Sequence, residues 1–567
     1  MQVNTKVMGK YLSILRTFFL GFIFMCMGFF YAHAQPRLMQ QEIKASGIRQ
    51  DGFSLLFETD VPSSYIIHLQ CIYGNQEKIV YQNKKGKSTL HEFVLNDVPP
   101  SSIYKTALKI FDAHKDTLYY KRHYATASRA PGRIKTYFNH TVDHTYAIDN
   151  PAINVAHHMR DTLIAYINRA EETLDIAIYN SHATDPYSGI SGAINAAHNR
   201  GVMVRVIYHG GTSSTMVSNL DGQIAVYARP TGYMLGLMHH KFIVADAHHQ
   251  DAGKAWVWTG STNWTNNQIN GPDKNNVIII YDQTLALTYT IEFEEIWGSN
   301  GPLPNPSNSR YGASKLDNTP KEFMIDSIYV ECYFSPSDNT EQQILKLIND
   351  AQDNIAVATM LITRETLANA LINRFNTGLH NFAILLDNQN PTGSQKPYLT
   401  NSLPPAHIKE FTGPGIMHHK MMVVDNGHAT AAVLTGSHNW SASAELRNDE
   451  NTLIIFDPSI ANQYYQAAAA LYSEAGGGMS VFEENTNRLS VHVYPNPAHH
   501  FLHLISNKEI EGVVKMHNLK GKLVLKKNIH VSFNKPEKIN IMDVKAGIYF
   551  LQLKTHDENF TTKIAIF

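Results

Sequence analysis

Two stretches of the chain carry the same polar residue types at the same spacing. Each reads histidine, one residue, lysine, four residues and aspartate, and is followed downstream by Gly-Ser, one residue and asparagine. The two copies consist of His239, Lys241, Asp246, Ser261 and Asn263, and of His418, Lys420, Asp425, Ser437 and Asn439. Two copies with the same downstream partner indicate an internal duplication. Because burial disfavours polar residues in apolar strands unless they have a task, the pattern predicts a functional site made of two half-sites.

Strand geometry predicts which of these side chains act together. Residues i and i+2 of a β-strand share a face, so the histidine and the lysine of each motif project together. The residue that follows each motif histidine, His240 or His419, points to the opposite face. We expect these two to be hydrogen-bonded core side chains.

The constellation resembles that of the phospholipase D superfamily, the HKD phosphodiesterases, over about residues 133–480. The resemblance implies two α/β halves packed about a pseudo-twofold axis, with both motifs at one cleft. It implies that one motif histidine attacks phosphorus to form a covalent phosphohistidine, while the other protonates the leaving oxygen and then activates water or an alcohol. The lysines and asparagines then hold the non-bridging phosphate oxygens with the serines beside them. Asp246 and Asp425 are expected to brace the site.

Elementary electrostatics agrees with these roles. A phosphodiester carries one negative charge, which spreads over its equatorial oxygens in the transition state, and two fixed ammonium groups with amide donors stabilise that spread. A neutral imidazole is a competent nucleophile near pH 7, and an imidazolium is a competent acid. Because the displacement is split into two steps, we expect neither a metal nor a cofactor.

The two halves differ at a position that bears on the roles of the histidines. The family usually carries a carboxylate about eleven residues beyond the motif asparagine, where it orients the histidine. Glu450 stands there in the second half and Asn275 in the first. A carboxylate raises the pKa of an imidazole, whereas an amide only fixes its tautomer. We therefore expect His418, in the half that carries Glu450, to be the acid and His239 to be the nucleophile; alternatively, Asp273 substitutes for the missing glutamate.

The elements around the motifs alternate between helix and strand in the same order twice, which indicates an α/β core of two halves, 133–300 and 321–475. The first half is expected to contain helices at 152–170 and 189–200, and strands at 174–179, 202–208, 238–245, 256–258 and 277–281. The second is expected to contain helices at 340–351 and 365–375, and strands at 355–358, 382–386, 417–424 and 452–456. Residues 298–320, rich in Gly, Pro, Asn and Ser, are predicted to link them.

Residues 1–34 are predicted to be a secretory signal peptide. Basic residues precede an apolar run at 18–31, and Ala32-His33-Ala34 forms a small-residue cleavage site before Gln35. The run is short for a membrane span, which favours cleavage over an uncleaved anchor.

Residues 36–131 predict about seven short strands, including 53–57 and 64–69. We expect a β-sandwich there, which resembles a fibronectin type III domain. Of the three cysteines, Cys26 leaves with the signal peptide. Because Cys71 and Cys332 fall in different predicted domains, we expect no disulfide framework.

A second flanking β module is predicted at 490–567, after a Gly-rich linker at 476–478. It begins with Tyr-Pro-Asn-Pro-Ala at 494–498 and contains Ala-Gly-Ile-Tyr-Phe at 546–550. It resembles the C-terminal sorting domain of the type IX secretion pathway of Bacteroidetes. The resemblance implies the secretion machinery as a partner and release or attachment at the cell surface. No obligate protein partner is otherwise evident.

The net charge and the residue types near the motifs help to choose between candidate substrates. Residues 133–480 hold 20 Lys and Arg against 32 Asp and Glu, a net charge of −12, which is the wrong sign to attract a polyanion. With the apolar approach at 233–238, which could also be a plain core strand, this favours an exported phospholipase D acting on phospholipid headgroups. The alternative is an extracellular nuclease in which Trp264 and Trp440 stack bases, although both could equally be packing residues. A remote alternative is an inactive surface adhesion protein, which the complete motif sets argue against.

Overall fold

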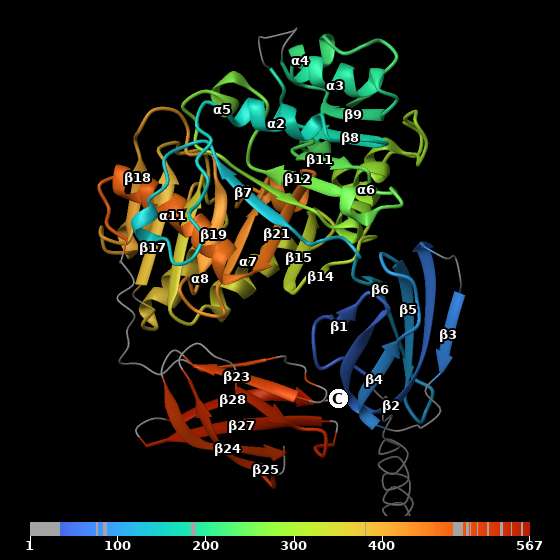
Figure 1. Ribbon diagram of the computed structural model, residues 1–567, viewed down its shortest axis with the longest axis vertical. Helices are drawn as coiled ribbons and strands as arrows, with labels where there is room; N and C mark the ends of the chain where they lie inside the picture. Colours follow the sequence, from blue (N-terminus) through green and yellow to red (C-terminus); the bar gives the residue numbers. More distant parts are fainter. Residues whose placement is uncertain are drawn as a thin grey trace, which may run out of the picture.

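The computed structural model describes residues 35–566 apart from several short segments (Figure 1). The segments left out are 75–77, 83–87, 183–188, 380, 480–490, 495–497, 499–500, 507–508, 519–520, 533–536, 546 and 557–558. The predicted signal peptide lies outside the described residues. Within them, no helix combines the length and the apolar character that crossing a bilayer requires.

An all-β module forms the N-terminal part of the structure (blue in Figure 1). Its strands are β1 (Ala45–Arg49), β2 (Gly52–Tyr73), β3 (Lys78–Gln82), β4 (Ser88–Leu95), β5 (Ile103–Phe111) and β6 (Thr117–Ala125). The two strands expected at 53–57 and 64–69 are the two ends of one continuous strand, β2. Its pairing register with β4 shifts between Glu58 and Ser63, and its two ends pair with different neighbours. The likeness to fibronectin type III domains stays a prediction.

The first α/β half is built on a seven-stranded sheet in the order β10-β9-β8-β11-β12-β13-β7. Its strands are β7 (Ile134–Phe138), β8 (Thr173–Ile178), β9 (Met203–His209), β10 (Ala225–Arg229), β11 (Lys241–Ala245), β12 (Trp256–Gly260) and β13 (Asn276–Ile280). Its α-helices are α2 (Met159–Ile167), α3 (Ile190–Asn199), α4 (Thr215–Ser218), α5 (Asn266–Ile269) and α6 (Gln283–Trp297), and its 3-10 helices are η1 (His144–Tyr146), η2 (Tyr233–Leu235) and η3 (Ala252–Lys254). Strands β11, β12 and β13 are buried at every position, as expected for a sheet covered on both faces.

The second half repeats this plan on an eight-stranded sheet in the order β14-β15-β21-β20-β19-β16-β17-β18. Its strands are β14 (Glu322–Ile325), β15 (Ile328–Ser335), β16 (Asn354–Thr359), β17 (Asn381–Asp387), β18 (Ile408–Phe411), β19 (Lys420–Val424), β20 (Ala432–Gly436) and β21 (Glu450–Phe456). Its helices are η4 (Gly312–Ser314), α7 (Thr340–Asp350), α8 (Glu365–Asn376), α9 (Lys396–Ser402), α10 (Ala442–Leu446) and α11 (Pro458–Glu474). The run β9-β8-β11-β12-β13 matches β17-β16-β19-β20-β21 strand for strand, so the duplication extends to the sheet topology.

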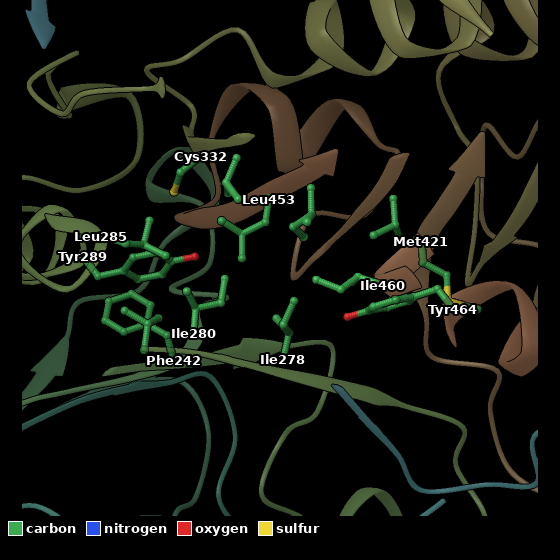
Figure 2. Packing of buried hydrophobic residues seen from close by; sticks show 14 of the residues in the cluster. Phe242, Ile278, Ile280, Leu285, Tyr289, Cys332, Met421, Leu453, Ile460 and Tyr464 are labelled. Carbon is green, nitrogen blue, oxygen red and sulfur yellow. The ribbon is translucent and has the colours of Figure 1, made fainter. Parts of the chain in front are cut away.

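The two halves share one apolar core (Figure 2). Phe242 of β11 and Ile280 of β13 face Leu453 of β21 and Cys332 of β15, and helices α6 and α11 add Tyr289 and Tyr464. The sequence pattern predicted no helix at either of these two positions. Because the core is continuous across the halves, neither sheet is an independent domain, and the two motifs are held in a fixed mutual position.

Polar contacts tie the N-terminal module to the second half. Arg122 of β6 forms an ion pair with Glu322 of β14 at 2.5 Å, and both side chains are buried. Lys44 reaches Glu331 of β15 at 2.5 Å. The expected linker also packs back on the core: Gly312 donates its N–H to Asp449, and the ammonium of Lys315 is buried against Glu292 of α6.

The C-terminal module (red in Figure 1) has two small sheets, β22-β23-β26 and β25-β24-β27-β28. The strands are β22 (Val491–Tyr494), β23 (Phe501–Ser506), β24 (Ile510–Asn518), β25 (Leu523–Val531), β26 (Glu537–Asn540), β27 (Gly547–Thr555) and β28 (Asn559–Ile566). They enclose an apolar core of their own that includes Leu504, Val514 and Leu551. Parts of the two quoted motifs, at 495–497 and 546, lie outside the described residues.

Candidate active site

The two motif histidines lie where the halves meet, each immediately before a central strand. Lys241 opens β11 and Lys420 opens β19, so the motif strands begin three residues later than expected. The N–H of His239 donates to the carbonyl of Asp449 at 3.0 Å, and the N–H of His418 donates to the carbonyl of Lys274 at 2.9 Å. Each motif is therefore held by backbone of the opposite half.

The side-chain partners of the histidines also cross between the halves. Nδ1 of His239 lies 2.7 Å from Oε2 of Glu450, and Nδ1 of His418 lies 2.9 Å from Oδ1 of Asn275. The premise that Glu450 serves the histidine of its own half is wrong. The contacts are reciprocal: Glu450 opens β21 and Asn275 directly precedes β13, and each of these strand starts lies beside the motif histidine of the other half. Asp273, the alternative carboxylate, instead accepts a hydrogen bond from the N–H of Ile416.

Hydrogen bonding fixes the tautomer of His418. Oγ of Ser261 accepts the backbone N–H of Asn276 and therefore has its own proton to give to Oδ1 of Asn275, 3.0 Å away. With that oxygen held as an acceptor, Nδ1 of His418 must carry the proton. Nε2 of His418 is left with a free lone pair or, when charged, with a second proton. Ser437 occupies the equivalent place in the other half, where its Oγ accepts the N–H of Asn451.

Both motif lysines are buried and held in the same way. Nζ of each donates to the carbonyl of its own motif histidine at 2.7 Å. The ring of Tyr179 lies 5.1 Å from Nζ of Lys241 and 4.8 Å from the ring of His239. Burial lowers the pKa of Lys420 to about 7 and that of Lys241 well below its usual value.

Electrostatics keeps both histidines neutral and Glu450 ionised in the free site. Burial lowers the pKa of His239 to about 4, although Glu450 acts in the opposite direction. Burial and the two neighbouring lysines hold the pKa of His418 well below its usual value. Burial would raise the pKa of Glu450, but His239 and Lys241 outweigh it and hold that pKa at about 2. An anion bound between the lysines would reverse the trend for His418 and for both lysines.

The motif asparagines and serines complete the cluster. Ser261 and Ser437 are fully buried. Asn263 and Asn439 each have a buried Oδ1 with no hydrogen-bond partner among the described residues. A buried acceptor without a partner is unfavourable, so each Oδ1 is open to a donor from outside the chain, whereas only the amide nitrogen of the same side chain can donate to a phosphate oxygen.

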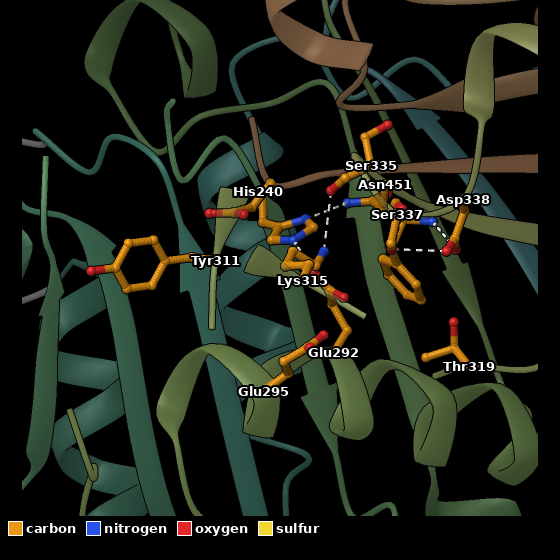
Figure 3. Close-up of polar contacts among 12 residues, drawn as sticks. His240, Glu292, Glu295, Tyr311, Lys315, Thr319, Ser335, Ser337, Asp338 and Asn451 are labelled. Carbon is orange, nitrogen blue, oxygen red and sulfur yellow. Dashed lines mark hydrogen bonds and ion pairs between the residues drawn. The ribbon is translucent and has the colours of Figure 1, made fainter. Parts of the chain in front are cut away.

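The second histidine of each motif belongs to a buried network that also joins the halves. Nε2 of His240 lies 2.6 Å from Oε1 of Glu292, and its Nδ1 faces the amide of Asn451 (Figure 3). In the other half, Nδ1 of His419 lies 2.8 Å from the amide nitrogen of Asn276 and its Nε2 lies 2.8 Å from Nε2 of His140. The expectation that these are satisfied core side chains is confirmed.

The motif aspartates lie at the far ends of the motif strands. Asp246 accepts the backbone N–H groups of Glu171, Glu172 and Thr173. Asp425 accepts those of Gln352 and Asp353. These contacts brace the loops before β8 and β16, in line with the expected bracing role.

Sequence reasoning missed several residues around the histidines. Met238 donates its N–H to His209 at 3.3 Å, and Met417 donates its N–H to Asp387 at 2.7 Å. His209 and Asp387 are the last residues of the matching strands β9 and β17, so the repeat alignment could have revealed them. Asp449 is fully buried and pairs with Arg229 at 2.9 Å, which no motif pattern indicated.

Other expectations concerned aromatic and metal-binding groups. Trp264 and Trp440 are fully buried, so they are packing residues and present no stacking surface. The described part of the chain contains no group of three or more His, Cys, Asp or Glu side chains placed to hold a metal ion.

Comparison with known proteins gives two family matches. The profile described as "Cardiolipin synthase, PLD-like domain" matches residues 163–297 and 344–472. The profile described as "Secretion system C-terminal sorting domain" matches residues 492–567. Each segment of the first match contains one complete motif with its downstream asparagine.

Individual relatives match over shorter stretches. A mitochondrial cardiolipin hydrolase of Xenopus tropicalis is 30% identical over 145 residues, which cover 25% of this chain and 61% of that protein. A phospholipase D of Rickettsia prowazekii is 32% identical over 139 residues, which cover 24% of this chain and 64% of that protein. The chain therefore spans less than two thirds of these relatives. The solved structure of a phospholipase D family member, Nuc, from Salmonella typhimurium is 25% identical and covers 26% of this chain and 94% of that one, with a TM-score of 0.23.

The duplicated motifs, the shared sheet plan and the two matched segments agree with one another. The chain contains a PLD-like domain in two matched segments, and it carries a type IX secretion C-terminal sorting domain.

Proposed function

We propose that this protein is a secreted, metal-independent phosphodiesterase of the phospholipase D type that works through a covalent phosphohistidine. The observation that carries the proposal is the crossed pair of dyads, His239 with Glu450 and His418 with Asn275, each beside a buried lysine. Two imidazoles with differently charged partners suit two different steps, and two ammonium groups suit one phosphate.

In the first step Nε2 of His239 attacks phosphorus. The bond from phosphorus to the leaving oxygen breaks, and that oxygen takes the proton from Nε2 of His418. Bound phosphodiester makes this protonation possible because its charge raises the pKa of His418. The phosphohistidine retains its Nδ1 proton and therefore carries a positive charge on the ring, which ionised Glu450 stabilises. His239 is therefore the proposed nucleophile, as the sequence predicted. The reason differs: Glu450 stabilises the charged ring of His239 and does not act on His418.

In the second step water replaces the ring. His418, now neutral, takes a proton from water while the water oxygen bonds to phosphorus. The bond from phosphorus to Nε2 of His239 breaks and the lone pair returns to the ring. Diester and water have become monoester and alcohol, and His418 is protonated again. Lys241, Lys420, Asn263 and Asn439 hold the non-bridging oxygens throughout, which replaces the charge that a metal could supply.

We favour phospholipid headgroups as the substrate. The catalytic region carries the net negative charge given above, which weakens attraction of a long polyanion. The two tryptophans that could have stacked bases are buried. An extracellular nuclease of the same superfamily is the second candidate, and an inactive adhesion protein is a remote third. The sorting domain supports export to the cell surface or beyond.

Trapping of the intermediate tests the mechanism. We expect His239→Ala to abolish both turnover and a ³²P-labelled adduct. His418→Ala should stop turnover but still form the adduct from a substrate with an activated leaving group, which needs no acid. Label recovered on His418 instead of His239 would reverse the assignment.

A parallel assay tests the substrate and the absence of a metal. Purified protein in excess chelator receives phosphatidylcholine or single-stranded DNA, and choline release and strand cleavage are measured. We expect choline release that chelator does not affect. Activity that is lost with chelator and regained with Ca²⁺ or Mg²⁺, at unchanged thermal stability, would contradict the metal-free mechanism.

A further inference from the structure

An exposed apolar loop lies next to the catalytic histidine of the first half. The segment at 233–238, one alternative for which was a plain core strand, forms the 3-10 helix η2 and the turn after it. Tyr233 is 82% exposed, Met234 72% and Leu237 36%. Leu237 lies two residues before His239, so the loop and the nucleophile share one short piece of backbone.

The second half adds apolar and basic side chains to the same place. The carbonyl of Arg447 lies against Gly236, where an added Cβ would come within 2.1 Å of it. The guanidinium of Arg447 lies 4.8 Å from the centre of the Tyr233 ring. Leu446, the neighbouring residue, is 58% exposed. We call Tyr233, Met234, Leu237, Leu446 and Arg447 the apolar rim.

The backbone of the apolar rim is held by a buried arginine, Arg229. Arg229 is fully buried, and its guanidinium donates to the carbonyls of Pro230, Leu235 and Gly236. The same guanidinium pairs with Asp449 at 2.9 Å, and Asp449 also accepts the N–H of Gly312. Arg229 thus binds the carbonyls of the loop and fixes its backbone. The apolar side chains of the loop point outward from this backbone.

The rim is connected to the catalytic groups by direct hydrogen bonds. Leu237 donates its N–H to Oδ1 of Asn448, and Nδ2 of Asn448 donates to Glu450, the partner of His239. A surface that rests on the rim therefore lies beside the nucleophile.

We propose that the apolar rim is a membrane-contact surface that presents phospholipid from a bilayer to the active site; this rests on the proposed function. Aliphatic side chains gain from entering the headgroup and acyl boundary, and tyrosine suits that boundary because it has an apolar body and a polar tip. The cation of Arg447 makes no ion pair with a carboxylate among the described residues, and its charge complements anionic lipid phosphate. The Tyr233 ring could also stack on a base, but nucleic acid fits the rim less well, because Met234, Leu237 and Leu446 offer neither hydrogen bonds nor a stacking face.

Vesicle binding tests the proposal independently of catalysis. The mature full-length protein is sedimented with phosphatidylcholine vesicles that contain phosphatidylglycerol. Met234→Asp and Leu446→Asp should each weaken binding at least about tenfold, because a carboxylate is expelled from the interface. The matched control is Met39→Asp, at a methionine that is 63% exposed in the N-terminal module, and it should bind like the natural protein. Arg447→Gln should reduce the preference for vesicles with phosphatidylglycerol over vesicles without it.

Activity assays separate this inference from the proposed function. We expect the rim variants to hydrolyse monomeric dihexanoyl phosphatidylcholine within about twofold of the natural protein, but long-chain vesicles at least about tenfold more slowly. Unchanged vesicle binding by both Met234→Asp and Leu446→Asp would overturn the proposal that the rim contacts the membrane. Hydrolysis of monomeric lipid would still support the proposed function. Rim-dependent binding without hydrolysis of either lipid would support the surface and overturn the function. Rim-dependent cleavage of single-stranded DNA, without vesicle binding, would assign the surface to nucleic acid instead.

Discussion

At the scale of single residues, the crossed partners decide what each histidine can do. Glu450 faces His239, and in the proposed mechanism it stabilises the positive charge on that ring while phosphorus is bound to it. We predict that Glu450→Gln slows adduct formation by about 100-fold or more. The reason is that loss of the carboxylate partner of a catalytic histidine can reduce the reaction rate by even more than this. Rapid-quench measurement of adduct formation checks this. The nearly isosteric change should leave the thermal midpoint close to that of the natural protein; slower breakdown with normal formation would contradict the assigned role.

The buried lysines predict the pH dependence. In the proposed mechanism each must be charged to hold phosphate, so activity should fall as pH rises through its pKa, which for Lys420 is about 7 in the free site. Bound phosphodiester stabilises the charged form and raises that pKa. We predict that kcat/KM already declines with rising pH below pH 7, because His418 loses its proton in the free site, and declines more steeply above about pH 7, where Lys420 does, whereas kcat declines only at higher pH. On the acid side kcat/KM should persist to near pH 4, because the pKa of His239 is about 4. Alkaline limbs that coincide in the two profiles would argue against lysine control.

At the scale of elements, the sequence correctly predicted the strands and helices that are determined by a local pattern of residues. Strands β8, β9, β12, β13, β16 and β17 lie within about two residues of their expected positions, because their apolar runs and flanking turns are local signals. The amphipathic helices α7 and α8 were found for the same reason. Helices α6 and α11 were missed because both are buried around most of their circumference and so lack a polar face.

The errors arose where tertiary contacts decide. The motif residues could be named from spacing alone, but the pairing of Glu450 with the opposite half follows from packing about the pseudo-twofold axis. Likewise, one long strand, β2, replaces two predicted strands because its neighbours change along its length. The loop at 233–237 has the composition of a core strand, but Tyr233, Met234 and Leu237 are exposed, and the buried Arg229 binds the loop carbonyls of Leu235 and Gly236.

The linker between the halves supplies a buried cation, which gives a prediction for stability. Lys315 is buried against Glu292, the carboxylate that holds His240 (Figure 3). Lys315→Ala leaves that buried carboxylate with less compensation and should destabilise the fold by about 3–5 kcal/mol. The matched control is Lys346→Ala, which removes an exposed ion pair with Asp350 and should cost about 0–1 kcal/mol. Urea denaturation of both variants provides the measurement, and equal losses would show that the linker contact is unimportant.

At the scale of the whole molecule, the modules differ in how closely they are joined. The N-terminal module meets the catalytic core through buried charge pairs such as Arg122 with Glu322, and the hydroxyl of Tyr73 donates to Glu294 of α6. The two α/β halves share one apolar core. The C-terminal module has its own core beyond the Gly-rich segment at 476–478. The first three parts should therefore unfold together, and the last should unfold separately.

This difference predicts what removal of the C-terminal module does. Deletion of residues 490–567 should leave kcat and KM of the purified protein unchanged, because the duplicated site and its hydrogen-bond partners lie entirely within 139–464. In the cell the same deletion should retain the enzyme inside the envelope, since the removed segment matches a sorting domain that the secretion machinery reads. Fractionation of a strain that makes the truncated protein, together with assay of the pure protein, tests both parts. Normal appearance outside the cell would refute the sorting role, and loss of activity in the pure truncated protein would show that the module supports the catalytic core.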